Sequence, residues 1–420
     1  MHSSFLRRIL VIGTLDTKGE EIRYLKEQLL AAGSFPEIVD IGVMGEPLFA
    51  ADVRREEIAA CAGESVEELR QGGDRGRAVA AMQRGLVAWI GKRHAQSPLA
   101  GVLAIGGSAG TSVATAAMQK LPIGVPKLMV STMASGDTRP YVGTTDLCMM
   151  YSVADFTGLN RLTRTVLGNA AHAMAGMACA AVPAPPEAKQ AKLLAATMFG
   201  VTTPCVNRVK ELLEETGCEL LVFHATGTGG LAMEQLVRDG FVEGVLDITT
   251  TEWADELVGG VLSAGPHRLE AAGEKGVPQV VSVGALDMVN FGAPETIPEK
   301  FRGRKFYQHN PNVTLMRTRP EENRELGRIL VEKVSAAKGP VTIMLPLRGV
   351  SAIDAEGGPF HDPEADRMLF DSIRREVSIM HSASVKLVEM DVHINDPVFA
   401  DRLVEEFNAI SGGQRIGAKS

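Results

Sequence analysis

Residues 101–112 read Gly-Val-Leu-Ala-Ile-Gly-Gly-Ser-Ala-Gly-Thr-Ser, and this segment limits most strongly what the chain can fold into. Its first half is an apolar run typical of a buried strand, and alanine-rich helical sequence follows the glycines at once. The glycines let the main chain approach a ligand, and Ser108, Thr111 and Ser112 are candidate caps for the new helix. The free N–H groups of such a helix suit a phosphate. The segment is neither a Walker A pattern nor Gly-x-Gly-x-x-Gly, and tight packing is the alternative role.

The same succession of an apolar run, a small-residue turn and a helical pattern repeats along the chain. We expect strands at residues 9–13, 38–43, 102–105, 127–131, 147–153, 193–199, 220–224, 242–248, 280–283, 341–345 and 385–391. Helical patterns cover residues 17–31, 75–94, 111–119, 158–181, 204–215, 231–238, 321–337, 363–377 and 397–410. Strands that alternate with helices predict right-handed crossovers and an α/β fold with mainly parallel sheets.

A proline-rich break divides this pattern in two. Residues 182–187, Val-Pro-Ala-Pro-Pro-Glu, fit neither a helix nor a strand and mark the clearest domain boundary. A chain of 420 residues is also too long for a single core. We therefore expect two doubly wound domains, an N-terminal one over residues 1–181 and a C-terminal one over 191–420, joined by a linker at 182–190.

Composition excludes several classes of function. The formal charge of −8 and the pI near 5.7 argue against a general nucleic-acid surface or a patch for anionic membranes. We find no apolar run of membrane-spanning length and no signal peptide before the first strand. The five cysteines lack any Cys-x-x-Cys spacing, as in a protein with reduced thiols. We therefore expect a cytoplasmic protein that has no membrane partner.

Polar residues follow four of the strands expected in the first domain. Because parallel strands end at one edge of a sheet, where doubly wound folds bind ligands, these loops should meet. The candidate contacts for a bound cofactor are Asp16, Thr17, Lys18, Asp40, Gly106, Gly107, Ser108, Gly110, Thr111, Ser131, Thr132, Gly136 and Asp137. Lys18 adds charge for a phosphate, a carboxylate could face magnesium, and Asp40 could hold a ribose hydroxyl. The plainer alternatives are a capping box from Thr17 to Glu20, a turn-forming Asp40 and a structural Asp155.

The second domain has a comparable set of polar residues after its strands. Residues 224–230, His-Ala-Thr-Gly-Thr-Gly-Gly, predict a second cradle for an anion or a carboxylate. We assign proton transfer to His224, His361, Glu252 and Asp354, and substrate contacts to Thr226, Gly227, Arg348 and Ser351. We expect His309 and Asn310 in a polar loop. The alternative is that these residues only stabilise long glycine-rich loops, and no metal ligands are assigned.

Four of these motifs together resemble one protein family. They are Leu-Asp-Thr-Lys-Gly-Glu at 15–20, Ile-Gly-Gly-Ser-Ala-Gly-Thr at 105–111, Ser-Thr-Met-Ala-Ser-Gly-Asp at 131–137, and the motif at 224–230. Along essentially its whole length the chain is similar to a largely uncharacterised bacterial and fungal family. That family also forms the N-terminal domain of a plant protein that inhibits RNA replication of tomato mosaic virus. The resemblance implies two Rossmann-like subdomains, ATP with Mg²⁺ in the first, and self-association.

Two classes of function fit these expectations. The first is an ATP-dependent enzyme acting on a small anionic metabolite, which the polar residues of the second domain favour. The second is a nucleotide-binding protein whose ATP supports a conformation or a protein contact without turnover, which the missing kinase and Walker signatures favour. We also expect a homo-oligomer, most simply a dimer, because the helix at 158–181 could present more apolar surface than one subunit covers, although that surface could equally be buried within its own subunit.

Overall fold

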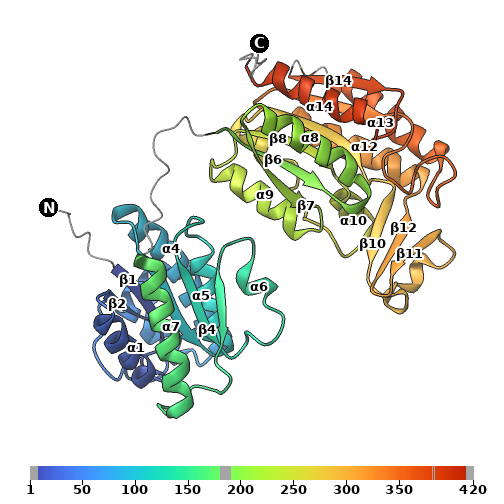
Figure 1. The fold of residues 1–420 in the computed structure, drawn as a ribbon. Coiled ribbons are helices and arrows are strands. Elements are labelled where there is room, and N and C mark those ends of the chain that lie inside the picture. Colours follow the sequence, from blue (N-terminus) through green and yellow to red (C-terminus); the bar gives the residue numbers. More distant parts are fainter. Residues whose placement is uncertain (1–7, 180–190, 381, 383, 413–420) are drawn as a thin grey trace. The chain divides into compact units, whose positions relative to one another are not determined.

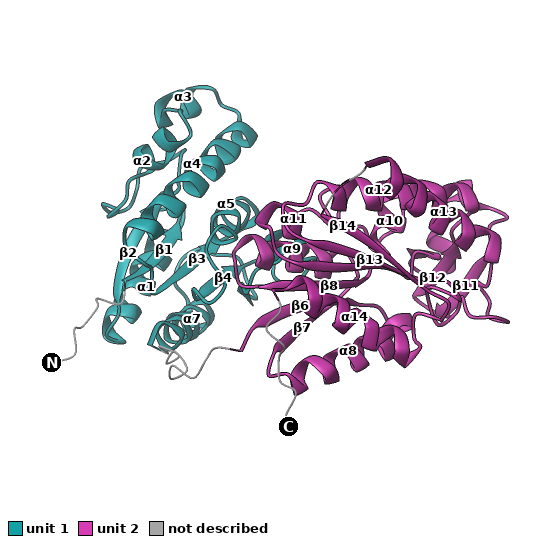
Figure 2. Cartoon of the chain, turned by 90° about the horizontal axis from the view of Figure 1, so that it is seen from above, with its two compact units in different colours: residues 1–186 teal, residues 187–420 magenta. Residues whose placement is uncertain are grey.

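The computed structural model describes residues 8–179, 191–380, 382 and 384–412. The chain divides into two compact units, residues 1–186 and 187–420, which Figure 2 distinguishes by colour. The predicted linker at residues 182–190 lies outside the described residues, as do the last two residues of the helix predicted at 158–181. Each unit has its own parallel sheet and its own hydrophobic clusters.

Unit 1 is a five-stranded parallel sheet with helices on both faces (Figure 1). The strand order is β2-β1-β3-β4-β5, with β1 at Arg8–Gly13, β2 at Phe35–Asp40, β3 at Gly101–Gly106, β4 at Lys127–Ser131 and β5 at Cys148–Tyr151. The helices are α1 (Gly19–Ala31), α2 (Arg55–Cys61), α3 (Val66–Gln71), α4 (Arg75–Gln96), α5 (Ser108–Met118), α6 (Arg139–Val142) and α7 (Arg161–Cys179).

Alternate residues of the central strand β1 pack into two different cores. Leu10 and Ile12 join residues of α2, α4 and α5 in one cluster, whereas Ile9 and Val11 join residues of α1 and α7 in the other. All four side chains are fully buried. Because β1 is covered on both faces, its sequence is an uninterrupted apolar run and not an alternating one.

Unit 2 contains a six-stranded parallel sheet wound in the same way. Its order is β14-β13-β9-β8-β6-β7, with β6 at Leu193–Met198, β7 at Glu219–His224, β8 at Gly244–Thr249, β9 at Gln279–Gly284, β13 at Val341–Pro346 and β14 at Val385–Met390. The helices are α8 (Thr203–Glu215), α9 (Thr228–Arg238), α10 (Glu252–Val258), α11 (Ala271–Lys275), α12 (Pro320–Ser335), α13 (Pro363–Met380) and α14 (Pro397–Ile410). Residues of α8 and α14 cover one face, and those of α9 to α13 cover the other.

Both sheets reverse their winding beside their first strand. From β1 the chain moves outward to β2 and then returns to β3 on the opposite side, and β6, β7 and β8 repeat this arrangement. Loops that leave such neighbouring strands in opposite directions form a crevice at the carboxyl edge, where folds of this type bind ligands. The predicted α/β class with two doubly wound, Rossmann-like and mainly parallel subdomains is confirmed.

A small antiparallel sheet is inserted in unit 2 between β9 and α12. It consists of β10 (Met288–Phe291), β11 (Phe306–Asn310) and β12 (Val313–Arg317) in the order β10-β12-β11. The expectation that His309 and Asn310 lie in a polar loop was wrong, because both residues end β11. All five residues of β11 are exposed, so the strand lacks the alternation of apolar and polar residues by which a half-buried strand is recognised.

The N-terminus of α1 also differs from the sequence-based prediction. The helix begins at Gly19 with Lys18 as its N-cap, and Lys18 makes no side-chain capping bond. Asp16 and Thr17 therefore do not cap this helix, and the capping box from Thr17 to Glu20, the plainer alternative for this loop, is absent. The carboxylate of Asp16 instead accepts the N–H of Gly45 at 3.0 Å.

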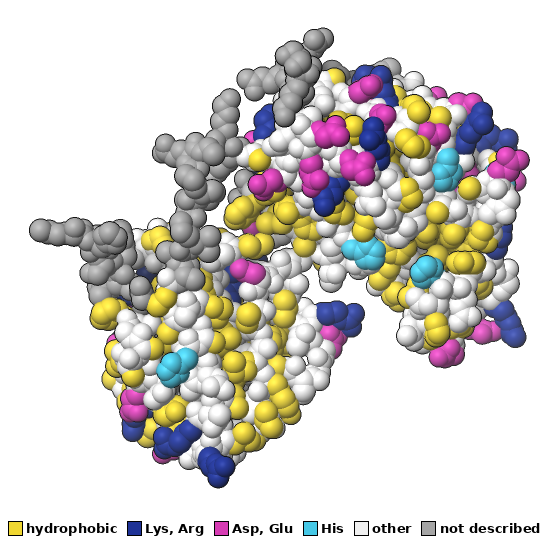
Figure 3. All heavy atoms as spheres, viewed as in Figure 1, with side chains coloured by type: hydrophobic (Ala, Val, Ile, Leu, Met, Phe, Trp, Pro, Cys, Tyr) yellow, Lys and Arg dark blue, Asp and Glu magenta, His cyan; other side chains and the backbone are white. Residues whose placement is uncertain are grey.

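The outer helices of unit 2 carry acidic and basic side chains side by side, as Figure 3 shows over α8 and α14. Arg208 pairs with Asp401 at 2.9 Å, and Lys386 pairs with Glu406 at 2.7 Å. The pair of Arg208 and Asp401 is exposed and contributes little to stability, whereas Glu406 is buried beneath Lys386. Among the described residues, no helix combines the length and the apolar character that a membrane span needs.

Candidate functional site

The carboxyl edge of the unit 1 sheet contains a cavity of about 700 Å³. The loops after β1, β2, β3 and β4 line it, together with the first turns of α4 and α5. Eight of the predicted cofactor contacts are on its wall: Asp16, Thr17, Lys18, Gly106, Gly107, Ser108, Gly110 and Thr132. The volume lies within the range of about 300–1,000 Å³ that is usual for small-molecule sites.

The turn from β3 to α5 presents unoccupied main-chain donors to this cavity. Gly107 is the N-cap of α5 and has no side chain to accept a hydrogen bond. Among the described residues, no side chain accepts the N–H of Ser108, Ala109 or Gly110. The predicted caps are therefore not formed. An uncapped helix N-terminus with its dipole aimed at a cavity is suited to bind an anion.

The glycines of this turn have different physical roles. A Cβ at Gly106 would lie 2.9 Å from the main chain of Gly110, so Gly106 allows β3 to pack tightly against α5. A Cβ at Gly107 would meet only the hydroxyl of Thr132 at 3.9 Å, and one at Gly110 only a carbonyl at 3.6 Å. Gly106 thus serves the fold, whereas Gly107 leaves space on the cavity wall.

Two cations reach the cavity, and the sequence analysis found only one of them. Lys18 lines the wall with its Nζ 3.5 Å from the carbonyl of Phe156 and 5.5 Å from the centre of that ring. Arg75 lines the wall at the first position of α4, next to the capping residue Asp74. The position of Arg75 directly after a helix cap could have identified it as a candidate. It was missed because α4 follows a polar stretch, and the search for site residues covered the segments that follow strands.

Buried hydrogen bonds occupy three of the other predicted cofactor contacts. Asp40 is 2% exposed and accepts the N–H groups of Leu15 and Gly42 and the Nε of Arg55 at 2.7 Å. These bonds hold the loops after β1 and β2 together. Thr111 and Ser131 are fully buried and share a hydrogen bond of 2.6 Å between their hydroxyls. Asp40, Thr111 and Ser131 therefore support the cavity from behind its wall.

Gly136 and Asp137 are exposed and are not among the residues that line the cavity. The carboxylate of Asp137 binds the guanidinium of Arg139 at 2.9 and 2.8 Å. These hydrogen bonds lower the pKa of Asp137 to about 2. The structure thus separates this pair from the other predicted contacts.

Further cavity residues were not assigned from the sequence. Asp155 is on the wall, although we favoured a structural role for it, and its carboxylate accepts the N–H of Phe156 at 2.8 Å. An apolar part of the wall is formed by Ile41, Val43, Met44, Ala78, Val79, Met82 and Val113. The cavity therefore combines polar groups at one helix end with an apolar surface, as small-molecule sites commonly do.

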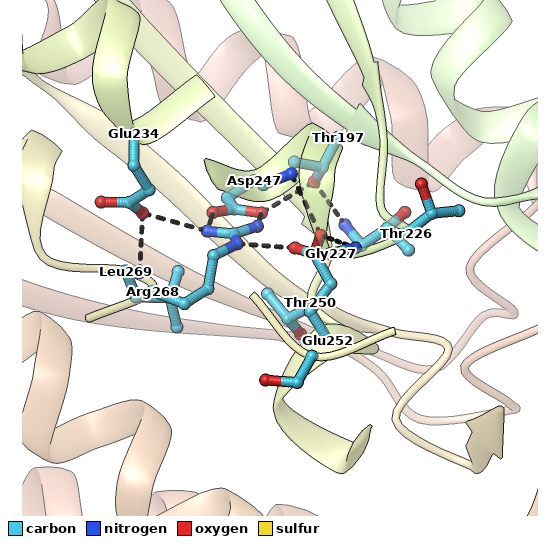
Figure 4. A network of polar contacts seen from close by, with 12 residues as sticks. Thr197, Thr226, Gly227, Glu234, Asp247, Thr250, Glu252, Arg268 and Leu269 are labelled. Carbon is cyan, nitrogen blue, oxygen red and sulfur yellow. Dashed lines mark hydrogen bonds and ion pairs between the residues drawn. The ribbon is translucent and has the colours of Figure 1, made fainter. Parts of the chain in front are cut away.

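The glycine-rich turn of unit 2, which was predicted to bind an external anion, binds a carboxylate of its own chain. Figure 4 shows the carboxylate of Glu252 beside this turn. Its Oε1 accepts the N–H of Gly227 at 2.7 Å and that of Gly230 at 3.0 Å. Glu252 is 1% exposed, so a substrate cannot reach this carboxylate while the turn keeps its conformation.

Arg268 connects Glu252 to two further buried carboxylates (Figure 4). Its Nε donates to Glu252 at 2.7 Å, and its other nitrogens reach Asp247 at 2.5 and 2.7 Å and Glu234 at 3.3 Å. Burial raises the pKa of Glu252, and the charge of Arg268 opposes that effect. The network joins α9, α10, β8 and the segment before α11. It fixes the position of the glycine-rich turn, and Glu252 occupies the N–H groups that an external anion would need.

A second buried network holds Ser351 and Asp354. The hydroxyl of Ser351 donates to Asp287 at 2.8 Å, and Asp354 accepts the N–H of Val350 at 2.9 Å. Arg317 reaches both Asp354, at 3.3 Å, and Asp366, at 2.6 Å. Burial and the neighbouring carboxylates raise the pKa of Asp354 to about 9, and the charge of Arg317 opposes that effect.

The remaining predicted residues of unit 2 are more accessible. His224 is exposed and stacks on Phe199 with 5.3 Å between ring centres, and the Thr226 hydroxyl donates to the His224 carbonyl at 3.2 Å. Arg348 is exposed and pairs with Asp391 at 2.7 Å. The ring of His361 lies 3.3 Å from the carbonyl of Asp354. The contacts of the described residues do not bring His224, Arg348 and His361 together.

Main-chain bonds connect the loops at the carboxyl edge of unit 2. The N–H of Ala352 donates to Val201 at 2.9 Å, and the N–H of Ala285 donates to Val350 at 2.9 Å. The side chain of Asn395 also donates to the Val201 carbonyl at 2.9 Å. The two units therefore differ: in unit 1 the helix donors face a cavity, and in unit 2 the carboxylate of Glu252 occupies the N–H groups of Gly227 and Gly230.

Comparison with known proteins assigns both units. Residues 7–183 match the N-terminal domain model, and residues 191–411 the C-terminal domain model, of the uncharacterised protein family UPF0261. A UPF0261 protein of Clostridium tetani is 50% identical over 94% of this chain and 96% of its own length. One of Rhizobium meliloti is 47% identical over 97% of this chain and 100% of its own length.

A plant protein is also similar to this chain. The ToMV resistance protein Tm-1(GCR237) of Solanum lycopersicum is 43% identical over 97% of this chain, which spans 56% of the tomato protein. Its similarity extends through both units and agrees with the resemblance of the four motifs. Two matching domain models and relatives of this identity place the chain: it belongs to the uncharacterised protein family UPF0261.

Proposed function

We propose that this protein binds ATP in the cavity of unit 1. The observation that supports this most directly is the uncapped N-terminus of α5, whose first N–H groups open onto a cavity of about 700 Å³ at the winding reversal between β1 and β3. Phosphate oxygens bound there would accept the N–H groups of Ser108, Ala109 and Gly110. The family resemblance of the motifs points to the same ligand.

The two cations and the apolar wall support a nucleotide over a bare anion. Lys18 and Arg75 would balance the negative charge of a triphosphate. The apolar surface of Val43, Val79 and Met82 would cover a planar base. An inorganic phosphate would use only the first of these two features.

Magnesium belongs to the same proposal, and the donors on the wall fit it. Mg²⁺ takes one or two carboxylates from the protein and completes its shell with phosphate oxygens and water. Asp155 lines the cavity, and Asp16 has a buried Oδ1 without a hydrogen-bond partner among the described residues. Because Arg55 lies 3.8 Å from the other oxygen of Asp16, Asp155 is the less compensated carboxylate of the two.

Between an enzyme and a nucleotide-dependent binding protein, the geometry favours the second. Two of the four residues expected to move protons in unit 2, Glu252 and Asp354, are buried in ion-pair networks. His224 and His361 keep an accessible or half-buried ring, so an enzyme acting on a small anionic metabolite remains the alternative. Release of ADP during incubation with metabolite pools would support that alternative.

Thermal unfolding with different nucleotides tests the proposal. A ligand that binds only the folded state stabilises it by RT ln(1 + [L]/Kd), about 2.7 kcal/mol at one hundred times Kd. We expect ATP with magnesium to raise the unfolding midpoint. Chelation of magnesium should make this rise smaller, and AMP should raise the midpoint less than ATP does. Equal shifts with ATP and with inorganic phosphate would reject a nucleotide site, and the absence of any shift would reject the cavity as an anion site.

A further inference from the structure

The antiparallel insertion of unit 2 has an unpaired edge strand. β11 is the outer strand of the order β10-β12-β11 (Figure 1), and Phe306 and Tyr307 in it are each 37% exposed. Within the described part of the chain, β11 pairs with β12 alone. Lys305 and Pro311 flank β11. Lysine and proline commonly protect strand edges in natural proteins, so these two residues limit new pairing to the few residues between them.

The strand register shows which main-chain groups point outward. The N–H of Arg317 in β12 donates to the carbonyl of Lys305 at 2.9 Å, so the main-chain groups of Lys305 face β12. Main-chain direction alternates from one residue to the next along an antiparallel strand. The N–H and C=O groups of Phe306 and the N–H of Gln308 therefore point away from β12, where another strand could pair with them. The register of β11 and β12 shifts between Gln308 and Asn310, so the regular alternation ends there.

A cavity of about 460 Å³ adjoins the same two residues. The side chains of Phe306 and Gln308 line it from β11, and Thr314, the partner of Gln308 on β12, lines it from the same face of the sheet. Ile297 and Phe301, from the segment before β11, add apolar surface. An additional strand beside β11 would place every second side chain on this face, next to the cavity.

The cavity also contains an unsatisfied hydroxyl. Thr314 is 3% exposed, and its Oγ1 has no hydrogen-bond partner among the described residues. A buried hydroxyl without a partner is unfavourable, so an occupant that supplies a polar atom would remove this cost.

Charge distinguishes between possible occupants. Lys300, Arg302 and Lys305 are exposed in the segment that precedes β11, and Glu299 balances only Arg302. A second copy of this chain would bring the same cations, and its residues 300–314 contain no Asp or Glu. An acidic segment of another polypeptide therefore fits this edge better than self-pairing does.

We propose that β11 and the adjoining cavity bind an extended peptide segment of another protein. The segment adds to the insertion as a fourth strand, hydrogen-bonded to the main chain of Phe306 and Gln308. It places an apolar side chain beside Ile297 and Phe301, and an acidic residue beside Lys305. Strand addition of this kind takes affinity from main-chain bonds and specificity from pockets for alternate side chains.

Selection from a displayed library of random twelve-residue peptides on the full chain tests this inference. We expect enriched sequences with alternating apolar residues and at least one acidic residue, and we expect their synthetic forms to slow amide exchange at Phe306 and Gln308. Gln308→Pro should weaken binding of these peptides at least tenfold, because it removes an outward N–H but no bond to β12. Gln308→Ala, which keeps that N–H, should change it less than threefold.

Lys305→Glu provides a second test that does not depend on a proline. It should weaken binding of the enriched acidic peptides and restore it for peptides in which the acidic residue is changed to lysine. Enriched peptides that bind all variants equally, or that protect amides elsewhere, would overturn the inference. A wild-type dimer that Gln308→Pro converts to a monomer would also overturn it, since the occupant would then be a second copy.

Discussion

Single carboxylates account for the different states of the two glycine-rich turns. At the start of α9, Glu252 accepts two main-chain N–H groups that an external anion would otherwise need. At the start of α5, no described side chain does the same for Ser108, Ala109 or Gly110. A helix N-terminus that is satisfied internally serves stability, and one that is left open to a cavity can serve binding.

Replacing Glu252 by Ala should destabilise unit 2 substantially. The change leaves the N–H groups of Gly227 and Gly230 without an acceptor and removes one partner of the buried Arg268. Breaking a buried ion pair from one side costs roughly 3–5 kcal/mol. Urea unfolding would measure the loss. Glu299→Ala, which removes an exposed partner of Arg302, is the matched control and should cost no more than about 0.5 kcal/mol.

The network of Asp354 should make stability depend on pH in a defined direction. Its pKa is raised from 3.8 to about 9 in the folded protein, so the folded state retains a proton that the unfolded state releases. Stability from this group is therefore complete below about pH 4 and falls as the pH rises towards 9. Asp354→Asn removes that titration. The unfolding midpoint of this variant, measured relative to that of the wild type, should rise between pH 5 and pH 8.5. A difference between the two midpoints that does not change with pH would contradict the assignment.

Among the secondary-structure elements, several strands and helices of the two parallel sheets were predictable from sequence. The bounds of β4 and α14 agree with the prediction, because a buried apolar run and a proline-started amphipathic helix are strong local signals. β11 was missed because nothing covers it, and its sequence therefore shows no hydrophobic period. β10 and β12 were missed as well, although nearly all of their residues are buried, because each is a short run inside an insertion that breaks the alternation of strands and helices.

Predicting the candidate sites was limited by long-range contacts. The loops around the unit 1 cavity could be expected from strand ends alone, since parallel strands share one edge. The occupation of the unit 2 turn could not, because Glu252 lies 22 residues after Gly230 and 16 before Arg268. No local pattern indicates which buried carboxylate will meet which N–H group. Arg75 was missed because it begins a helix that does not directly follow a strand.

The turn between β3 and α5 allows a prediction about a whole element. Gly106→Ala should destabilise unit 1 by roughly 1–3 kcal/mol, because its Cβ would lie 2.9 Å from the main chain of Gly110. Gly110→Ala should be tolerated, since its nearest neighbour is a carbonyl at 3.6 Å. Thermal unfolding of both variants would compare them. Equal stability would show that β3 and α5 do not pack as closely as described.

At the scale of the whole molecule, the two units have the same strand order around their first strand, but the loops at the carboxyl edges of their sheets differ. Each has its first strand between the second and third. In unit 1 the uncapped donors of α5 face a cavity, whereas in unit 2 Glu252 accepts two N–H groups of the comparable turn. Most of the large apolar residues of α7 are covered within unit 1, where Leu167, Ala170 and Met174 pack in the cluster that includes α1, and Leu162 near its start is exposed. The helix therefore gives no separate reason for a dimer, and self-association stays a prediction from the family resemblance.

Calorimetric titration of the full chain with ATP and magnesium tests the central claim most directly. We predict one ATP bound per chain, and a loss of binding of at least tenfold in Gly107→Val. The Cβ of that side chain would lie in the space before the first turn of α5, with the Thr132 hydroxyl as its nearest neighbour at 3.9 Å. Gly91→Val, at an exposed glycine with open space farther along α4, is the matched control and should bind like the wild type. Undiminished ATP binding by a folded Gly107→Val variant would contradict the account.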